Sequence, residues 1–103
     1  MQLRKYRWSR DYESAEEELE QLFAHKKIQA ERWHADEFQE LPGQTLPHDR
    51  QLWCAEGSIV YTVHAPDGDK RFSLQPGDAL DLPAGTRHSA VAGFTGAVCY
   101  RTI

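Results

Sequence analysis

The chain has 103 residues, 40% hydrophobic and 27% charged, with a formal net charge of −4. This length suits one domain with a single core, and the negative charge argues against nucleic acid as the main partner, because phosphate binding needs a basic surface. No apolar run approaches the roughly 20 residues that span a bilayer, and the first eight residues lack the apolar stretch of a secretory signal. We therefore expect a cytoplasmic protein with no membrane partner.

The first 27 residues predict a short strand and one helix. Tyr6 and Trp8 alternate as in a strand, and such a strand could pair with a sheet edge of a second copy, so a homodimer is expected. Residues 14–26 predict a helix, because Ser14 and Glu17 fit a capping box and acids precede bases as the helix dipole favours. Its apolar face comprises Tyr12, Ala15, Leu19, Leu22 and Phe23.

After Lys27 the segments become short, rich in β-branched and aromatic residues, and separated by turn signals. Pro66-Asp67-Gly68 predicts a hairpin turn. The predicted strands are 28–37, 44–48, 51–55, 58–64, 70–74, 79–82, 88–92 and 96–102. This pattern is typical of an all-β barrel or sandwich. We expect residues 1–27 to pack as a strand and a helix on a barrel made of residues 28–103.

The two cysteines, Cys54 and Cys99, lie inside apolar runs. Their spacing is far from C-x-x-C, and free cysteine is among the most buried residue types. We therefore expect two buried free thiols, as is usual in a cytoplasmic protein, rather than a disulfide or a redox pair.

The most specific motif of the chain covers residues 77–88, where two tight turns flank an apolar run and deliver one imidazole, His88, to the start of a strand. The spacing resembles the second signature of the cupin family, G-x5-P-x-G-x2-H-x3-N. Four positions match it: Gly77, Pro83, Gly85 and His88. Ala92 stands where the family has Asn. With the neighbouring strands, residues 42–101 resemble a small cupin, which implies a cupin-type jelly-roll β-barrel with a central pocket, here with one N-terminal helix.

The first signature of the cupin family, G-x5-H-x-H-x(3,4)-E-x6-G, is degenerate in this chain, and two alignments are open. Counting back from Gly57 puts Arg50 at the Glu position and Gln44 at the first His position. Counting forward from Gly43 puts His48 and Arg50 near the H-x-H pair, one residue early, and leaves no Glu. In both alignments His48 is the only imidazole of the segment.

The cupin resemblance implies a divalent metal, iron, manganese, nickel or zinc, with His48 and His88 as its ligands. Such a site usually has three or four protein ligands. Gln44, His64 and His34 are the residues that could complete it, although both histidines could equally be surface or hydrogen-bonded side chains. Arg50 at a ligand position opposes a metal, because its charge is positive and fixed.

Without a metal, Arg50 takes on another meaning. A guanidinium that faces a barrel interior needs a partner, and a carboxylate or phosphate of a ligand would fit its fork geometry. The alternatives are an outward-facing side chain or an internal salt bridge to Asp49, Glu56 or Asp81. Trp53 and Tyr61 are the other candidate ligand contacts, with barrel wall or core as the alternative role.

Fold does not decide function, and three functions stay open. The first is binding of a small molecule in the barrel pocket, with or without a divalent metal. The second is a metal-dependent cupin enzyme, an oxygenase or isomerase acting on a small polar substrate. The third is a metal-free acid–base enzyme with His88 as the proton carrier. The sequence predicts a pocket protein for a small molecule and leaves catalysis open.

Overall fold

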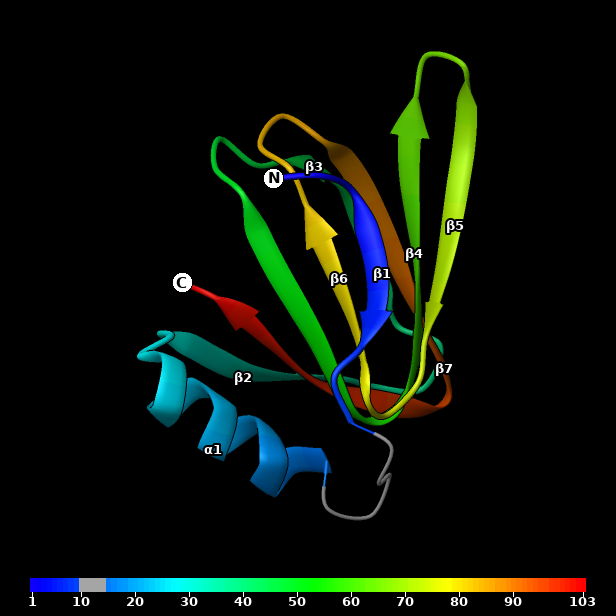
Figure 1. Cartoon of the computed structure of the whole chain (residues 1–103). Coiled ribbons are helices and arrows are strands. Elements are labelled where there is room, and N and C mark those ends of the chain that lie inside the picture. The colour runs from blue at the N-terminus through cyan, green and yellow to red at the C-terminus, as the bar shows by residue number, and fades with distance from the viewer. Residues whose placement is uncertain (10–14) are drawn as a thin grey trace.

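The computed structural model describes residues 1–9 and 15–103. This part of the chain contains one helix, α1 (Ala15–Lys26), and seven strands joined in one antiparallel sheet (Figure 1). The strands are β1 (Arg4–Arg7), β2 (Ala30–Ala35), β3 (Glu40–Thr45), β4 (Arg50–Ala65), β5 (Gly68–Leu74), β6 (Asp78–Leu82) and β7 (Arg87–Thr102). The prediction of an all-β fold with one N-terminal helix is confirmed. The predicted cap Ser14 and the apolar Tyr12 lie outside the described residues.

The sheet is organised around two long central strands, β4 and β7. Its order is β1-β6-β4-β7-β2, with β5 added to β4 and β3 added to β7. One end of β4 pairs with β6 and the other with β5, while β7 pairs first with β3 and then with β2. Because each long strand changes its outer neighbour along its length, the sheet curves around a core, as Figure 1 shows.

Both long strands carry an irregularity where the sequence predicted a break. The predicted division of β4 into two strands at Glu56-Gly57, and of β7 at Gly93, is wrong, because each strand is continuous over 16 residues. The register of the β4–β7 pair instead shifts on either side of Gly57. Gly57 and Gly96 have φ of 71° and 74°, which favours glycine. An extra residue in one strand reverses which face later side chains occupy.

Side chains on the two faces of the sheet form two apolar cores. The barrel interior contains Leu52, Cys54, Ile59, Tyr61, Leu80 and Cys99, among others. The opposite face of β4 carries Trp53, which packs with Leu19 of α1. Phe23 of the same helix meets Trp53 edge-on, with ring centroids 4.8 Å apart. Helix α1 is thus held by the outer face of the barrel wall.

The N-terminal strand β1 joins the chain's own sheet by pairing with β6. Asp78, 3% exposed, anchors it by an ion pair with Arg7 at 2.8 Å and by its backbone carbonyl, which accepts the Trp8 indole N–H at 3.1 Å. Within the described residues, no helix is long and apolar enough to cross a membrane. The homodimer, predicted from this strand, stays a prediction.

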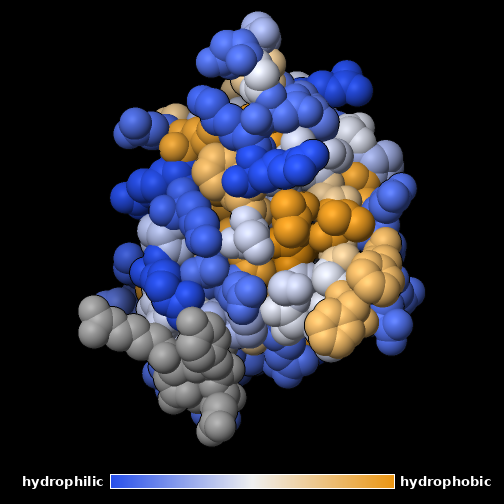
Figure 2. All heavy atoms as spheres, turned by 90° about the vertical axis from the view of Figure 1, so that its right-hand side faces the viewer, coloured by the Kyte–Doolittle hydropathy of each residue, from blue (hydrophilic) through white to orange (hydrophobic). Residues whose placement is uncertain are grey.

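Figure 2 shows the side of the molecule that is on the right in Figure 1. Hydrophobic side chains gather near the middle of this face, and hydrophilic side chains surround them. The exposed large hydrophobic residues of the strands and turns are Phe38, Val91 and Phe94, with exposed fractions of 64%, 37% and 72%. The Phe38 amide donates to the Gly93 carbonyl at 3.1 Å, so the segments that carry the two phenylalanines are held side by side.

Candidate functional site

The barrel interior opens into a small pocket, here called the barrel pocket, between β2, β3, β4 and β7. Its polar and aromatic lining residues are Trp33, Gln44, Arg50, Tyr61, His88, Ser89 and Arg101. A water-sized group has only about 20 Å³ available, and the empty space reaches about 320 Å³ when the open mouth is counted. This pocket can enclose a small polar group and leaves the rest of a ligand in the mouth.

The bulge at Gly57 brings Arg50 and Tyr61 into the same pocket. They lie eleven positions apart on β4, so a regular strand would send them to opposite faces. The register shifts on either side of Gly57 reverse the alternation, and both line the barrel pocket. Gln44 and His88 face each other as register partners of β3 and β7. In the alignment that counts back from Gly57, Gln44 stands at the first His position of the signature. Its place opposite His88 agrees with that alignment.

His88 is 3% exposed, and its Nδ1 lies 3.3 Å from the Thr86 carbonyl oxygen. Donation from Nδ1–H to that carbonyl leaves Nε2 as the ring atom with a free lone pair. Burial lowers the pKa of His88, the Thr86 contact opposes this, and the Arg50 charge adds to the lowering. His88 is therefore neutral at pH 7.

Two donors in the barrel pocket lack acceptors. Arg50 is half-buried and makes no hydrogen bond or ion pair with any residue that the structure describes. The indole Nε1 of Trp33 is buried and, over the same part of the chain, has no acceptor. Arg101 differs, because its Nε lies 2.5 Å from Glu31.

The internal salt bridges predicted as alternatives for Arg50 are not formed. Asp81 instead pairs with Arg4 at 3.4 Å. Asp49 accepts the Ala84 amide at 2.8 Å. Glu56 is exposed. The Arg50 guanidinium therefore keeps a net positive charge at the pocket without a compensating carboxylate from the described residues.

The four candidate metal ligands are not brought together. His48 is exposed in the loop after β3. His64 pairs in register with Arg87, on the face opposite to His88, and its ring nitrogens contact Asp69 at 3.2 Å and the Ser89 hydroxyl at 2.9 Å. Only Gln44 and His88 share the barrel pocket.

The further candidate, His34, is exposed and lies 3.3 Å from Asp36. Among residues 1–9 and 15–103, no group of three or more His, Cys, Asp or Glu side chains could hold a metal ion. One imidazole, one amide and a guanidinium do not fit the three or four ligands of a divalent metal site.

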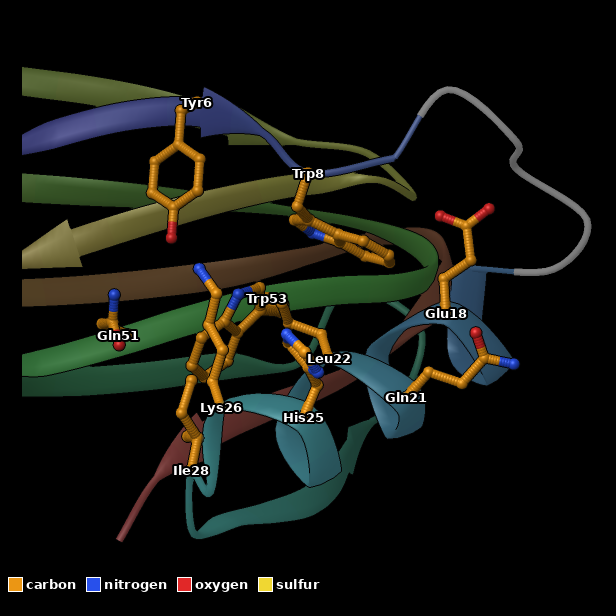
Figure 3. Close-up of a pocket in the computed structure, with 10 residues that line it drawn as sticks. All are labelled: Tyr6, Trp8, Glu18, Gln21, Leu22, His25, Lys26, Ile28, Gln51 and Trp53. Carbon is orange, nitrogen blue, oxygen red and sulfur yellow. The ribbon is translucent and has the colours of Figure 1, made fainter.

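Trp53, the third predicted ligand contact, faces away from Arg50 and Tyr61. It lines a second and larger pocket on the outer face of the sheet, together with Tyr6, Trp8 and residues of α1 (Figure 3). The sequence reasoning missed Trp33 and Arg101 of the barrel pocket. Trp33 is the register partner of Cys99, whose side chain faces the barrel interior, and Arg101 lies two positions after Cys99 on β7 and faces the same way. This arrangement becomes visible only once the pairing of β2 with β7 is known.

No family model and no curated protein matches this sequence. Solved structures do match. The Drosophila melanogaster CENP-C cupin domain, in a structure bound to CAL1, is 18% identical with a TM-score of 0.67, over 74% of this chain and 64% of that one. A DUF861 family protein from Thermotoga maritima is 17% identical with a TM-score of 0.63, over 99% of both chains.

An oxalate decarboxylase from Bacillus subtilis is 18% identical with a TM-score of 0.65, over 70% of this chain and 20% of that one. The matched region thus spans less than two thirds of the CENP-C chain. These likenesses, together with the antiparallel barrel, establish the cupin fold for this protein. Because that fold carries both an enzyme and a domain bound to another protein, it does not by itself define an activity.

Proposed function

We propose that this cupin-fold protein binds a small organic anion, with a carboxylate as its head group, in the barrel pocket. The unpaired Arg50 is the observation that carries this proposal. Its guanidinium is half-buried at the pocket with no carboxylate beside it among the described residues, so an anionic ligand would supply the opposite charge. The orphaned indole N–H of Trp33 lines the same pocket, so two donors there lack an acceptor within the described part of the chain.

Five residues of the pocket have distinct roles in this proposal. Arg50 binds the two carboxylate oxygens in its planar fork, and Trp33 donates to one of them. His88 is neutral in the free protein, and the negative charge of the ligand would raise its pKa. The amide of Gln44 and the hydroxyl of Tyr61 fix the orientation of the ligand. The limited space of about 20 Å³ favours a ligand that inserts only its head group.

A metal-dependent reaction is not part of this proposal, because among the described residues the predicted ligands that reach the pocket are His88 and Gln44, beside a fixed positive charge. A neutral imidazole could still act as a general base on a bound molecule. The lowered pKa of His88 supports that second candidate function, which would need a substrate already held by Arg50.

The test is a titration of the ¹⁵N-labelled protein with acetate, succinate and phosphate, with acetamide as the neutral control. Saturable shifts of the Trp33 indole signal with the anions alone are expected. Arg50→Met should weaken binding about 10- to 100-fold, since a charge-assisted hydrogen bond contributes about 1.5–3 kcal/mol. Arg71→Met makes the same charge change at an exposed position of β5, outside the barrel pocket, and should change affinity less than threefold. An unchanged affinity in Arg50→Met, or no response to any anion, would refute the proposal.

A further inference from the structure

The pocket on the outer face of the sheet is far larger than the barrel pocket and has different chemistry. This helix groove lies between α1, β1 and β4 and has a volume of about 730 Å³, within the range of small-molecule sites. Figure 3 shows Tyr6 of β1 and Trp8, which directly follows that strand, on the side of the groove that faces Trp53 of β4 and the helix. Leu22 of α1 and Ile28 complete its apolar walls.

The aromatic walls of the helix groove are held in fixed positions. The Trp8 indole N–H donates to the Asp78 carbonyl at 3.1 Å, which sets the plane of that ring. Trp53 is 1% exposed and rests edge-on against Phe23, with 70° between the ring planes. A site with preorganised side chains loses less conformational entropy when a ligand binds.

The polar groups at one end of the groove are hydrogen-bond donors. The Nε1–H of Trp53 is buried and finds no acceptor within the described residues. Burial, and then the Asp81 carboxylate, raise the pKa of Tyr6, while the neighbouring side chains of Trp53 and Gln51 act in the opposite direction by pointing donors at its hydroxyl oxygen. Lys26 lines the same end and forms no ion pair with a described residue.

The opposite end of the groove carries the carboxylate of Glu18 (Figure 3). A negative group on a ligand would be attracted toward Lys26. The Asp81 carboxylate near Tyr6 at the Lys26 end is paired with Arg4 at 3.4 Å, which offsets its charge. The groove thus has a cation and hydrogen-bond donors at one end and aromatic and aliphatic walls in the middle.

We propose that the helix groove is a second ligand site, for a small aromatic carboxylate whose ring packs against Trp8 and Trp53 and whose carboxylate reaches Lys26 and the buried indole N–H. Flat rings pair well with indole faces and edges, and the carboxylate would give the Trp53 N–H a stronger acceptor than the neighbouring Tyr6 hydroxyl, with which it makes no well-formed hydrogen bond. This site is independent of the barrel pocket, because Trp53 and Arg50 lie on opposite faces of β4.

The three tryptophans of the sequence give an experiment that reports the two pockets separately. Trp33 lines the barrel pocket, while Trp8 and Trp53 line the helix groove. Their indole N–H signals are followed in the ¹⁵N-labelled protein, after assignment by single Trp→Phe variants. The probe is 2-naphthoate, and its neutral amide, 2-naphthamide, is the matched control.

We expect 2-naphthoate to shift the Trp53 and Trp8 signals saturably, and to do so equally in Arg50→Met, because a response of Trp33 reports the carboxylate site of the barrel pocket and not the helix groove. Lys26→Met should weaken binding about fivefold, as for one exposed ion pair. Lys70→Met makes the same charge change on β5, outside the groove, and should leave affinity unchanged.

Three outcomes would overturn the proposal: a shift of Trp33 alone, equal binding of 2-naphthamide, or no response at millimolar probe. Acetate acting on Trp33 tests the barrel pocket in the same samples, so either site can fail without the other.

Discussion

Replacing Gly57 by alanine should destabilise the protein strongly, because this glycine lets β4 and β7 touch at their bulges. A Cβ atom at Gly57 would lie 2.0 Å from the Gly96 carbonyl oxygen and 3.1 Å from the Ala97 Cα. Both contacts are with backbone, so the strands must move apart. Left-handed strain costs about 1–2 kcal/mol and overpacking about 1–3 kcal/mol. We expect Gly57→Ala to lower the free energy of unfolding by about 2–5 kcal/mol.

Gly85→Ala is the matched control, because Gly85 also has a positive φ, of 80°, but a Cβ atom there would meet no described atom within 4 Å beyond its chain neighbours. Strain alone, partly offset by lower entropy of the unfolded chain, should cost about 1 kcal/mol. The assay is urea unfolding followed by tryptophan fluorescence, with the m-value compared between variants. In thermal scans Gly57→Ala should melt about 10–30 °C lower than the wild type. Equal losses in the two variants would show that the contact with Gly96 is not what requires glycine.

Two further predictions concern titratable groups inside the barrel. Burial lowers the pKa of His88, so the unfolded chain binds more protons below about pH 6.5 and stability should fall as the pH drops through that region. His88→Asn should flatten the dependence of the urea midpoint on pH, whereas His48→Asn, in an exposed loop, should leave it unchanged. If the urea midpoint varied with pH equally in the wild type and in His88→Asn, burial of His88 would not be the cause. The neighbouring Cys54 thiol and burial raise the pKa of Cys99, so both thiols should react with Ellman's reagent only as fast as the protein unfolds. Rapid labelling in native buffer would contradict this.

The sequence was most informative where local chemistry dictates the backbone. The turns around Pro83 and Gly85 predicted the position of β6 and the entry of His88 into β7, and both are observed. The acidic first turn and basic last turn predicted α1 to within one residue. The two cysteines were predicted to be buried and free, and this is confirmed. These features depend on residues close in sequence, so no knowledge of strand pairing was needed.

The division of candidate residues between the two pockets was not predictable, because it depends on long-range pairing. Arg50 and Trp53 lie three positions apart on β4, so their side chains face opposite sides of the sheet. Which side faces which pocket becomes known only when the neighbouring strands of β4 are known. The Glu56-Gly57 pair has the composition of a turn, and only the contact between Gly57 and Gly96 turns it into a bulge in a continuous strand. A turn would have ended the strand, whereas the bulge keeps it and reverses its faces.

The same bulge shows how a degenerate cupin signature would leave the anion pocket proposed above. Gln44 faces His88 across β3 and β7, and in the alignment that counts back from Gly57 Arg50 stands at the position of the carboxylate ligand. A metal ion and its acidic ligand together present positive charge to a bound molecule, and a guanidinium presents it without the metal. The exchange of a carboxylate for arginine therefore removes the means of holding a cation while it retains the attraction for an anion. On this reasoning Arg50→Glu would do more than abolish anion binding, because it would also return a carboxylate to the side of His88 and Gln44.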